Sequence, residues 1–190
     1  MVDEKIAKEL MPRILSFGID DVEVMSVVLK LIDVTDNGSI SSGRFPKEEI
    51  LDYHIYIACL ACEYPLSIFE VDYKRKMENK SPLKISVIDI VKNIAREIGI
   101  DLKEFPFKKY VDKVLKMIGI DDPIKKMFWE FYNEHQNALR YRDVNMSVGL
   151  VLYCLKKDGK VLDSTTLVKI ARNLHVTDIG IRQAYREMMK

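Results

Sequence analysis

The sequence contains little cysteine and little histidine, and neither residue forms a recognisable cluster. Three cysteines and three histidines, His54, His135 and His175, occur in 190 residues. An odd number of cysteines without the spacing of a disulfide framework fits a reducing compartment. The sequence shows no nucleophile–base–acid set, no glycine-rich phosphate loop and no paired carboxylates at a sharp turn. Because active sites are usually recognised from such patterns, we expect a protein that is not an enzyme.

Two of the cysteines have the spacing of a metal-binding pair. Cys59 and Cys62 form a Cys-x-x-Cys motif inside an apolar stretch. A zinc site would need two further ligands, and the sequence places none nearby. We therefore expect both residues to be buried thiols that pack as small hydrophobic groups, with no bound metal and no cofactor.

Long apolar runs are also missing. No run approaches the roughly 20 residues that a helix needs to cross a bilayer. The first residues, Met1-Val2-Asp3-Glu4-Lys5, are charged where a signal peptide would become apolar. We expect a soluble protein of the cytoplasm, associated with the nucleoid and without membrane contact.

The formal net charge of +1 hides an asymmetry along the chain. Residues 1–70 carry six Lys/Arg and thirteen Asp/Glu, a net charge of −7, so the remaining 120 residues carry +8. Phosphate contacts supply most of the sequence-independent affinity of DNA-binding proteins. Any DNA partner should therefore face the C-terminal two thirds of the chain; the alternative is an ordinary solvated surface.

Three short segments occur twice, in the same order and at similar spacing. The pairs are residues 14–21 with 115–122, residues 50–60 with 146–155, and residues 91–98 with 181–188. Such a pattern indicates a duplicated unit of roughly 90 residues. Chance similarity between amphipathic helices is the alternative interpretation.

Helical periodicity dominates both halves, and strand signals are few. The stretches 55–60 and 146–155 are apolar nearly all round, which is typical of a helix enclosed by others. Gly18 and Gly119 follow apolar periodic segments and should end helices in the left-handed conformation. We predict an all-α protein of two five-helix units, residues 1–103 and 104–190, each with its third helix at the centre.

The last segment, residues 165–188, resembles the end of the second cyclin repeat of the archaeal and eukaryotic transcription initiation factor B family. There a helix is followed by a valine-threonine-acidic turn and by a helix with an arginine and a Tyr-basic-Glu-apolar ending. The present chain has Val176-Thr177-Asp178, Arg182 and Tyr185-Arg186-Glu187-Met188 in these places. The resemblance implies two tandem cyclin-like repeats with a helix-turn-helix at the C-terminus.

Other segments are similar to further parts of that family. Residues 105–111 and 115–120 resemble the inter-repeat linker and the first helix of the second repeat, and residues 56–59 and 94–102 resemble parts of the first repeat. The resemblance covers nearly the whole chain. It implies double-stranded DNA as a partner, with the TATA-binding protein or another transcription protein as a second one.

The sequence departs from the family in three ways. It contains neither the zinc ribbon nor the linker that precede the repeats, so we expect no polymerase recruitment of the usual kind. Its first repeat is acidic, whereas the resemblance implies docking on the TATA-binding protein partly through basic side chains. Gly180 and Ala184 stand where the family tends to have polar or basic residues, which weakens base reading.

The residues of the last helix by themselves indicate a face that could contact DNA bases. Helical spacing turns Ile181, Ala184, Tyr185 and Met188 inward and the polar residues outward. Arginine can pair with guanine and glutamine with adenine in the major groove, and Gly180 would permit close backbone approach. The predicted DNA-binding residues are Thr177, Asp178, Gly180, Arg182, Gln183 and Arg186, with Lys156, Lys157 and Lys160 as phosphate contacts. The alternative is a solvated helix face.

Aromatic residues gather around Trp129, where Phe128, Phe131 and Tyr132 adjoin it. Core packing is the expected role, with a groove for a partner helix as the alternative.

We expect a DNA-associated transcription regulator or a truncated initiation factor B paralogue that binds promoter DNA through its second repeat. The alternative is a protein-binding cyclin-like module that makes no DNA contact.

Overall fold

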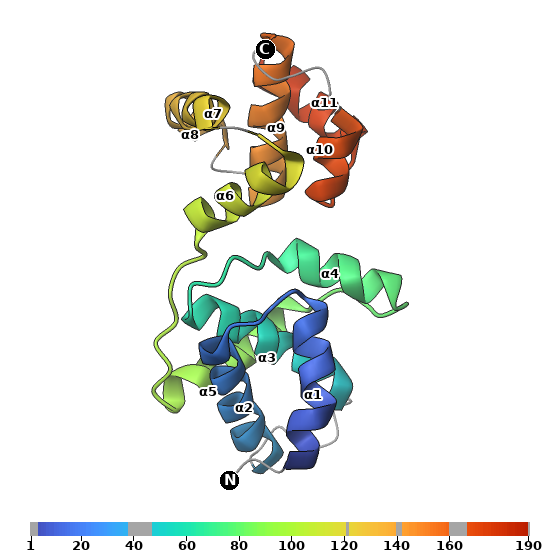
Figure 1. Ribbon diagram of the computed structural model, residues 1–190, viewed down its shortest axis with the longest axis vertical. Coiled ribbons are helices and arrows are strands. Elements are labelled where there is room, and N and C mark those ends of the chain that lie inside the picture. Colours follow the sequence, from blue (N-terminus) through green and yellow to red (C-terminus); the bar gives the residue numbers. More distant parts are fainter. Residues whose placement is uncertain (1–3, 38–46, 121, 140–141, 160–166, 190) are drawn as a thin grey trace. The chain divides into compact units, whose positions relative to one another are not determined.

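The computed structural model describes residues 4–37, 47–120, 122–139, 142–159 and 167–189. Within these ranges the chain forms eleven α-helices and no strand (Figure 1), so the all-α prediction is confirmed. The helices are α1 (Glu4–Ser16), α2 (Val22–Asn37), α3 (Lys47–Ala61), α4 (Ile68–Met77), α5 (Ile85–Glu97), α6 (Phe107–Ile118), α7 (Asp122–Glu134), α8 (Gln136–Leu139), α9 (Val144–Lys157), α10 (Leu167–Asn173) and α11 (Asp178–Met188). Among the described residues, no helix has both the length and the apolar character that a bilayer span requires.

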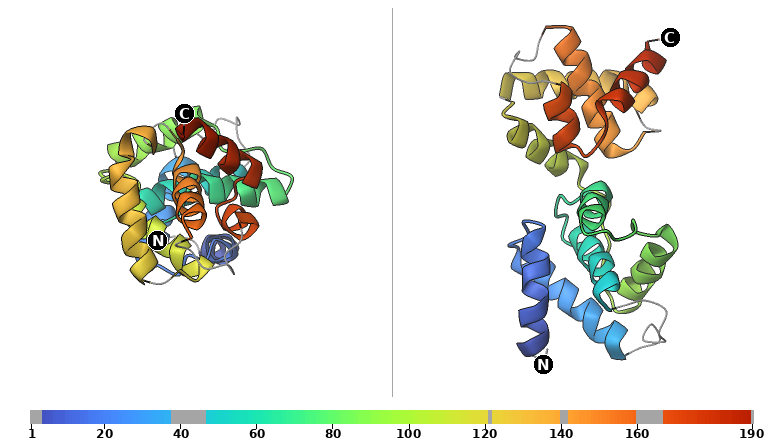
Figure 2. Two further views of the ribbon diagram at one scale, coloured as in Figure 1. Left: turned by 90° about the horizontal axis from the view of Figure 1, so that it is seen from above. Right: turned by 90° about the vertical axis from the view of Figure 1, so that its right-hand side faces the viewer.

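The helices divide into two compact units. Unit 1 is Met1–Pro106 with α1 to α5, and unit 2 is Phe107–Lys190 with α6 to α11. Each unit contains one helix that contacts most of the others: α3 packs against α2, α4 and α5, and α9 packs against α7, α10 and α11 (Figure 2). Because each central helix is surrounded, it can be apolar on nearly every side.

Burial follows the apolar pattern in both central helices. In α3, Ile55, Ile57 and Ala58 are fully buried. In α9 an unbroken run from Ser147 to Leu155 is buried. The prediction of two enclosed apolar helices is therefore confirmed, but the enclosed helix of unit 2 is the fourth of its unit and not the third.

The number of helices in unit 2 differs from the prediction of five per unit. A single helical turn, α8, follows α7 after an interruption at His135 and makes a sixth helix. This turn places Leu139 in the core, with 1% of its surface exposed. The Ser147 hydroxyl donates to the Leu139 carbonyl at 3.2 Å, which ties the turn to α9. Burial of this one leucine explains a turn for which the local sequence has no helical periodicity.

The segments that occur twice in the sequence occupy corresponding places in the two units. The first pair begins in the last turns of α1 and α6, the second lies in α3 and α9, and the third lies in α11 and at the end of α5. Both α1 and α6 are followed by a glycine in the left-handed region, Gly18 at φ 71° and Gly119 at φ 82°. Left-handed residues at helix ends let the last carbonyls accept hydrogen bonds, and glycine adopts this conformation without strain.

The two cysteines of the Cys-x-x-Cys motif have different environments. Cys59 is fully buried, as predicted, but Cys62 is only half-buried. The reason is that α3 ends at Ala61, and Glu63 turns the chain with a φ of 50°. Burial, with the nearby carboxylates of Glu23 and Asp21, raises the pKa of Cys62 to about 11, so the thiol stays protonated at neutral pH. The described residues contain no group of three or more potential metal ligands.

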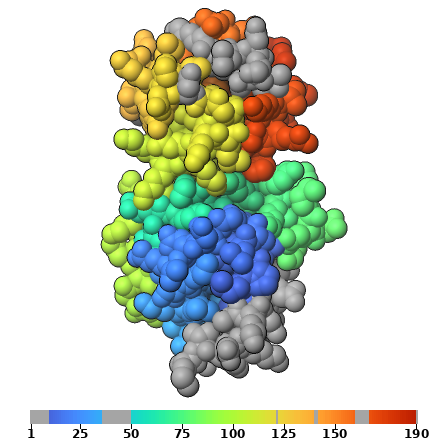
Figure 3. All heavy atoms as spheres, in the orientation of Figure 1, coloured from blue at the N-terminus to red at the C-terminus, as the bar shows by residue number. Residues whose placement is uncertain are grey.

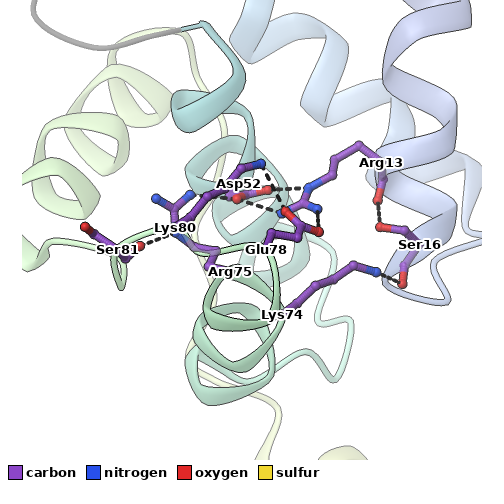
Figure 4. A network of polar contacts seen from close by, with 8 residues as sticks. All are labelled: Arg13, Ser16, Asp52, Lys74, Arg75, Glu78, Lys80 and Ser81. Carbon is purple, nitrogen blue, oxygen red and sulfur yellow. Dashed lines mark hydrogen bonds and ion pairs between the residues drawn. The ribbon is translucent and has the colours of Figure 1, made fainter.

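Unit 1 contains a buried ionic network that sequence patterns did not indicate (Figure 4). Asp52 of α3 is completely buried and accepts hydrogen bonds from Arg13 of α1 at 2.7 and 2.8 Å. Arg75 of α4, 1% exposed, donates to the same carboxylate at 2.7 Å and to the Ser81 carbonyl at 2.6 Å. Arg13 also pairs with Glu78. Arg13 and Arg75 thus connect α1 and α4 to the central helix α3.

Candidate nucleic-acid interface

Helices α10 and α11 form a helix-turn-helix within unit 2. The four-residue turn Leu174–Thr177 joins them, and Leu174 is fully buried. His175 occupies the left-handed region at φ 53°, and the N–H of Val176 donates back to the Ala171 carbonyl at 3.1 Å. This hydrogen bond closes the end of α10 and redirects the chain into α11.

A buried amide attaches this turn to the rest of unit 2. Asn145 of α9 is fully buried, and its Nδ2 donates to the Leu174 carbonyl at 2.6 Å. The Tyr110 hydroxyl of α6 donates to Asn145 Oδ1 at 2.9 Å. One side chain therefore satisfies a carbonyl of the turn and connects α6, α9 and the helix-turn-helix.

A glycine of α9 lies where Leu174 and Ile181 pack closely against that helix. A Cβ atom at Gly149 would lie 3.0 Å from Ile181 Cδ1 and 3.2 Å from Leu174 Cδ1. The absent side chain lets Ile181, which is fully buried, approach the backbone of α9. The orientation of α11 within unit 2 is thus fixed by direct contact with the core.

Thr177 is the N-cap of α11. Its hydroxyl accepts a hydrogen bond from the Gly180 N–H at 3.0 Å, which satisfies one of the free donors of the first turn. A Cβ at Gly180 would lie 2.9 Å from this hydroxyl and 3.2 Å from Met146 Cε. The missing side chain of Gly180 therefore makes room for the cap and for α9. The role expected from the sequence, close approach of DNA, stays a prediction.

The inward and outward faces of α11 follow the helical prediction. Ile181 and Ala184 are buried, Tyr185 and Met188 are half-buried, and the polar positions lie outside. Arg182, Gln183 and Arg186 are exposed, and Asp178 is half-exposed. Helix α11 forms part of the surface of unit 2 (red in Figure 3). Its polar face can therefore reach a partner.

Local pairs restrain two of these side chains. Asp178 Oδ2 lies 3.8 Å from Arg182 Nε one turn later in the helix. The Gln183 amide donates to Glu187 at 3.2 Å, and Arg142 lies 3.2 Å from the other oxygen of Glu187. An exposed pair such as Asp178–Arg182 contributes about 0.2–0.5 kcal/mol, so a ligand that offers Arg182 a better partner can displace it.

The structure brings the predicted phosphate and base contacts together in one open pocket. Lys156 and Lys157 at the end of α9 line it with Arg182 of α11, and Tyr153, Leu167 and Val168 complete the lining. The Lys157 ammonium lies 5.9 Å from the centre of the Tyr153 ring. Lys160, the third predicted phosphate contact, lies outside the described residues. The pocket is thus lined by three cationic side chains together with apolar and aromatic ones.

Helices α10 and α11 each present an exposed apolar side chain that the sequence pattern did not mark as functional. Val168 is 66% exposed at the start of α10, and Ile179 is 72% exposed in the first turn of α11. The helical wheel of α11 carries the available signal, because Ile179 is an apolar residue on an otherwise polar face. A side chain of this kind in the first turn of a recognition helix can contact the methyl group of thymine.

The charge of unit 2 favours an anionic partner. Residues 107–190 carry sixteen Lys/Arg and ten Asp/Glu, a net charge of +6, whereas residues 1–106 carry −5. The two units therefore differ in the sign of their net charge, although the difference is larger when the chain is divided after residue 70. Electrostatic attraction of a polyanion would be directed to unit 2.

The aromatic residues around Trp129 pack within unit 2. Phe128 is fully buried, and the Trp129 ring meets Phe107 of α6 edge to face with centroids 5.9 Å apart. Tyr132 lies 4.9 Å from Phe107, centroid to centroid. These rings join α6 to α7, which agrees with the expected packing role.

Comparison with known proteins found no family model that matches the chain and no similar protein of curated function.

Proposed function

We propose that the protein is a DNA-associated transcription regulator that binds double-stranded DNA through the helix-turn-helix of unit 2. The observation that carries this proposal is the open pocket in which Lys156, Lys157 and Arg182 meet beside α11. Phosphate oxygens prefer such clusters of cations, and Val168 can pack against the deoxyribose between two phosphates.

In this arrangement α11 enters the major groove with its first turns. Arg182 and Gln183 are exposed there and carry the donors and acceptors that read guanine and adenine, and Ile179 adds an apolar contact. The Asn145 and Gly149 contacts hold the helix rigidly to the core, which recognition of a defined sequence requires. Arg186, one turn later, would reach the backbone or a flanking base.

We further propose that the two units are tandem cyclin-like repeats, as in the initiation factor B family. The support is the matching position of the three repeated segments in the first, central and last helices of each unit. The protein would then be a paralogue of that factor. The TATA-binding protein or another transcription protein would be its partner on promoter DNA.

Binding of the full chain to duplex DNA over a series of salt concentrations tests this proposal. Random-sequence and promoter duplexes, each with and without a TATA-binding protein, form the four arms. We expect the logarithm of the association constant to fall linearly with the logarithm of salt concentration. Absence of binding to every duplex at low salt would refute the proposal.

A second candidate function, a protein-binding module without DNA contact, is favoured by one feature of unit 1. Along α2 an open pocket is lined by Val22, Met25 and Leu29, and Val22 is 78% exposed. Apolar surface of this kind suits a partner helix. If this candidate is correct, Val22→Asp should abolish the binding of a partner protein, and neither the wild type nor the variant should bind duplex DNA.

A further inference from the structure

The Gln183 side chain on the outer face of α11 is held by a chain of polar contacts. Its Nε2 donates to Glu187 Oε1 at 3.2 Å, and Arg142 Nη2 lies 3.2 Å from Glu187 Oε2. The same Arg142 nitrogen lies 3.5 Å from the Ala184 carbonyl. The Arg142 side chain is 23% exposed, against 49% for Glu187. Glu187 is thus anchored to a more buried residue that directly precedes the N-cap of α9.

This anchoring restricts what Gln183 can recognise. A glutamine amide has two N–H donors and one acceptor oxygen, whereas an ionised carboxylate can only accept. The contact to Glu187 therefore uses one N–H and leaves one N–H and the oxygen free. Adenine presents one acceptor and one donor in the major groove, which match the two groups that remain.

Guanine presents two acceptors at the same edge, N7 and O6. An unrestrained glutamine could turn both N–H groups toward them. While Glu187 holds one N–H, Gln183 offers guanine only the other N–H, and its free oxygen would face guanine O6. The negative charge of the Glu187 carboxylate would also repel guanine O6.

We propose that Glu187, held in place by Arg142, is a specificity-determining residue that restricts Gln183 to adenine. This inference rests on the proposed binding of DNA by α11. Glu187 and Arg142 are positioning residues, because they act through the Gln183 amide.

The test uses the full chain and a duplex selected from a random pool at low salt. Each adenine of the selected site is replaced by guanine in turn, and the affinity ratio is measured. We expect about a fivefold or larger ratio at one position, and a ratio near one at that position for Glu187→Ala. Glu187→Gln keeps an acceptor for Gln183 and should retain most of the ratio.

Glu134→Ala is the matched control, because Glu134 is an exposed glutamate of unit 2 outside this chain of contacts. It removes the same charge and should leave the ratio unchanged. An unchanged ratio in Glu187→Ala, or an equal loss in Glu134→Ala, would overturn the inference while leaving DNA binding intact. Absence of duplex binding by the wild-type protein would refute the proposed function, and the adenine reading with it.

A second measurement does not depend on DNA. In the free protein, NMR relaxation of the Gln183 side-chain amide should report a restrained group in the wild type and in Glu134→Ala, and a mobile one in Glu187→Ala. Equal mobility in all three proteins would overturn the inference.

Discussion

Each unit has a buried polar side chain in its central helix, and the two side chains are satisfied in different ways. In unit 1 the buried Asp52 carboxylate is neutralised by Arg13 and Arg75. In unit 2 the buried Asn145 amide is satisfied by a hydroxyl and a carbonyl, with no charge involved. Unit 1 therefore uses Arg13 and Arg75 internally, whereas unit 2 keeps Lys156, Lys157 and Arg182 at its surface. Because Arg13 and Arg75 are paired with Asp52, they are not offered to an anionic partner, whereas the three cationic residues of unit 2 line an open pocket.

The largest expected effect concerns the charged network. Asp52→Ala leaves the guanidinium of Arg75, 1% exposed, without its carboxylate partner. Removing one partner of a buried ion pair costs about 3–5 kcal/mol. We expect the free energy of unfolding, measured by urea denaturation, to fall by this amount. A loss below that of Asn145→Ala would contradict the contrast between the two units.

The neutral network should be weaker. Asn145→Ala removes the partners of the Leu174 carbonyl and the Tyr110 hydroxyl. Leaving buried polar groups without hydrogen bonds costs about 1–3 kcal/mol. Hydrogen exchange should also quicken in the turn that precedes α11. Unchanged exchange there would show that Asn145 does not hold the helix-turn-helix.

Arg182→Ala tests whether Arg182 of α11 contacts a base or a phosphate. As a base contact, Arg182 should contribute about 1–3 kcal/mol, and its loss should relax sequence preference in a competition assay with selected and scrambled duplexes. Arg182 also lines the pocket of Lys156 and Lys157. An equal loss on every duplex would assign it to phosphate and contradict the base-reading role.

A smaller effect should appear as pH dependence of unit 1. Partial burial opposes ionisation of Glu78, but hydrogen bonds from Arg13 and Lys80 outweigh it and lower the Glu78 pKa. Since the pKa is lower in the folded state, Glu78 stabilises the protein above the unfolded-state pKa, about 4.3, and this stability is lost as pH falls through the folded value. Glu78→Gln should flatten the stability profile in acid, measured by thermal unfolding between pH 2 and 6. An unchanged profile would contradict the assignment.

Most helices could be predicted from the sequence because their apolar residues recur at helical spacing. The contacts that bind helices together could not be predicted in this way. Asp52 meets Arg13 and Arg75 across 39 and 23 positions of the chain, and periodicity carries no information about such distances. The α8 turn was missed for a related reason, since the burial of Leu139 is decided by α9.

The residues of the candidate site could be predicted from the sequence, but the way in which they come together in one pocket could not. The outward face of α11 follows from helical geometry, so Arg182 and Gln183 were identified correctly as exposed. That Lys156 and Lys157 share a pocket with Arg182 depends on the packing of α9 against α11, which Gly149 permits. Sequence spacing gives no sign of that contact.

The most direct measurement is the salt dependence of duplex binding for the wild type, Lys157→Ala and Lys126→Ala. Lys126 lies on α7, is 81% exposed and carries the same charge outside the pocket. Lys157→Ala should weaken binding to all duplexes alike and lower the salt slope by about one unit, while Lys126→Ala should leave both unchanged. Equal effects of the two substitutions, or none from either, would contradict the assignment of the pocket as the phosphate contact of a DNA-binding unit.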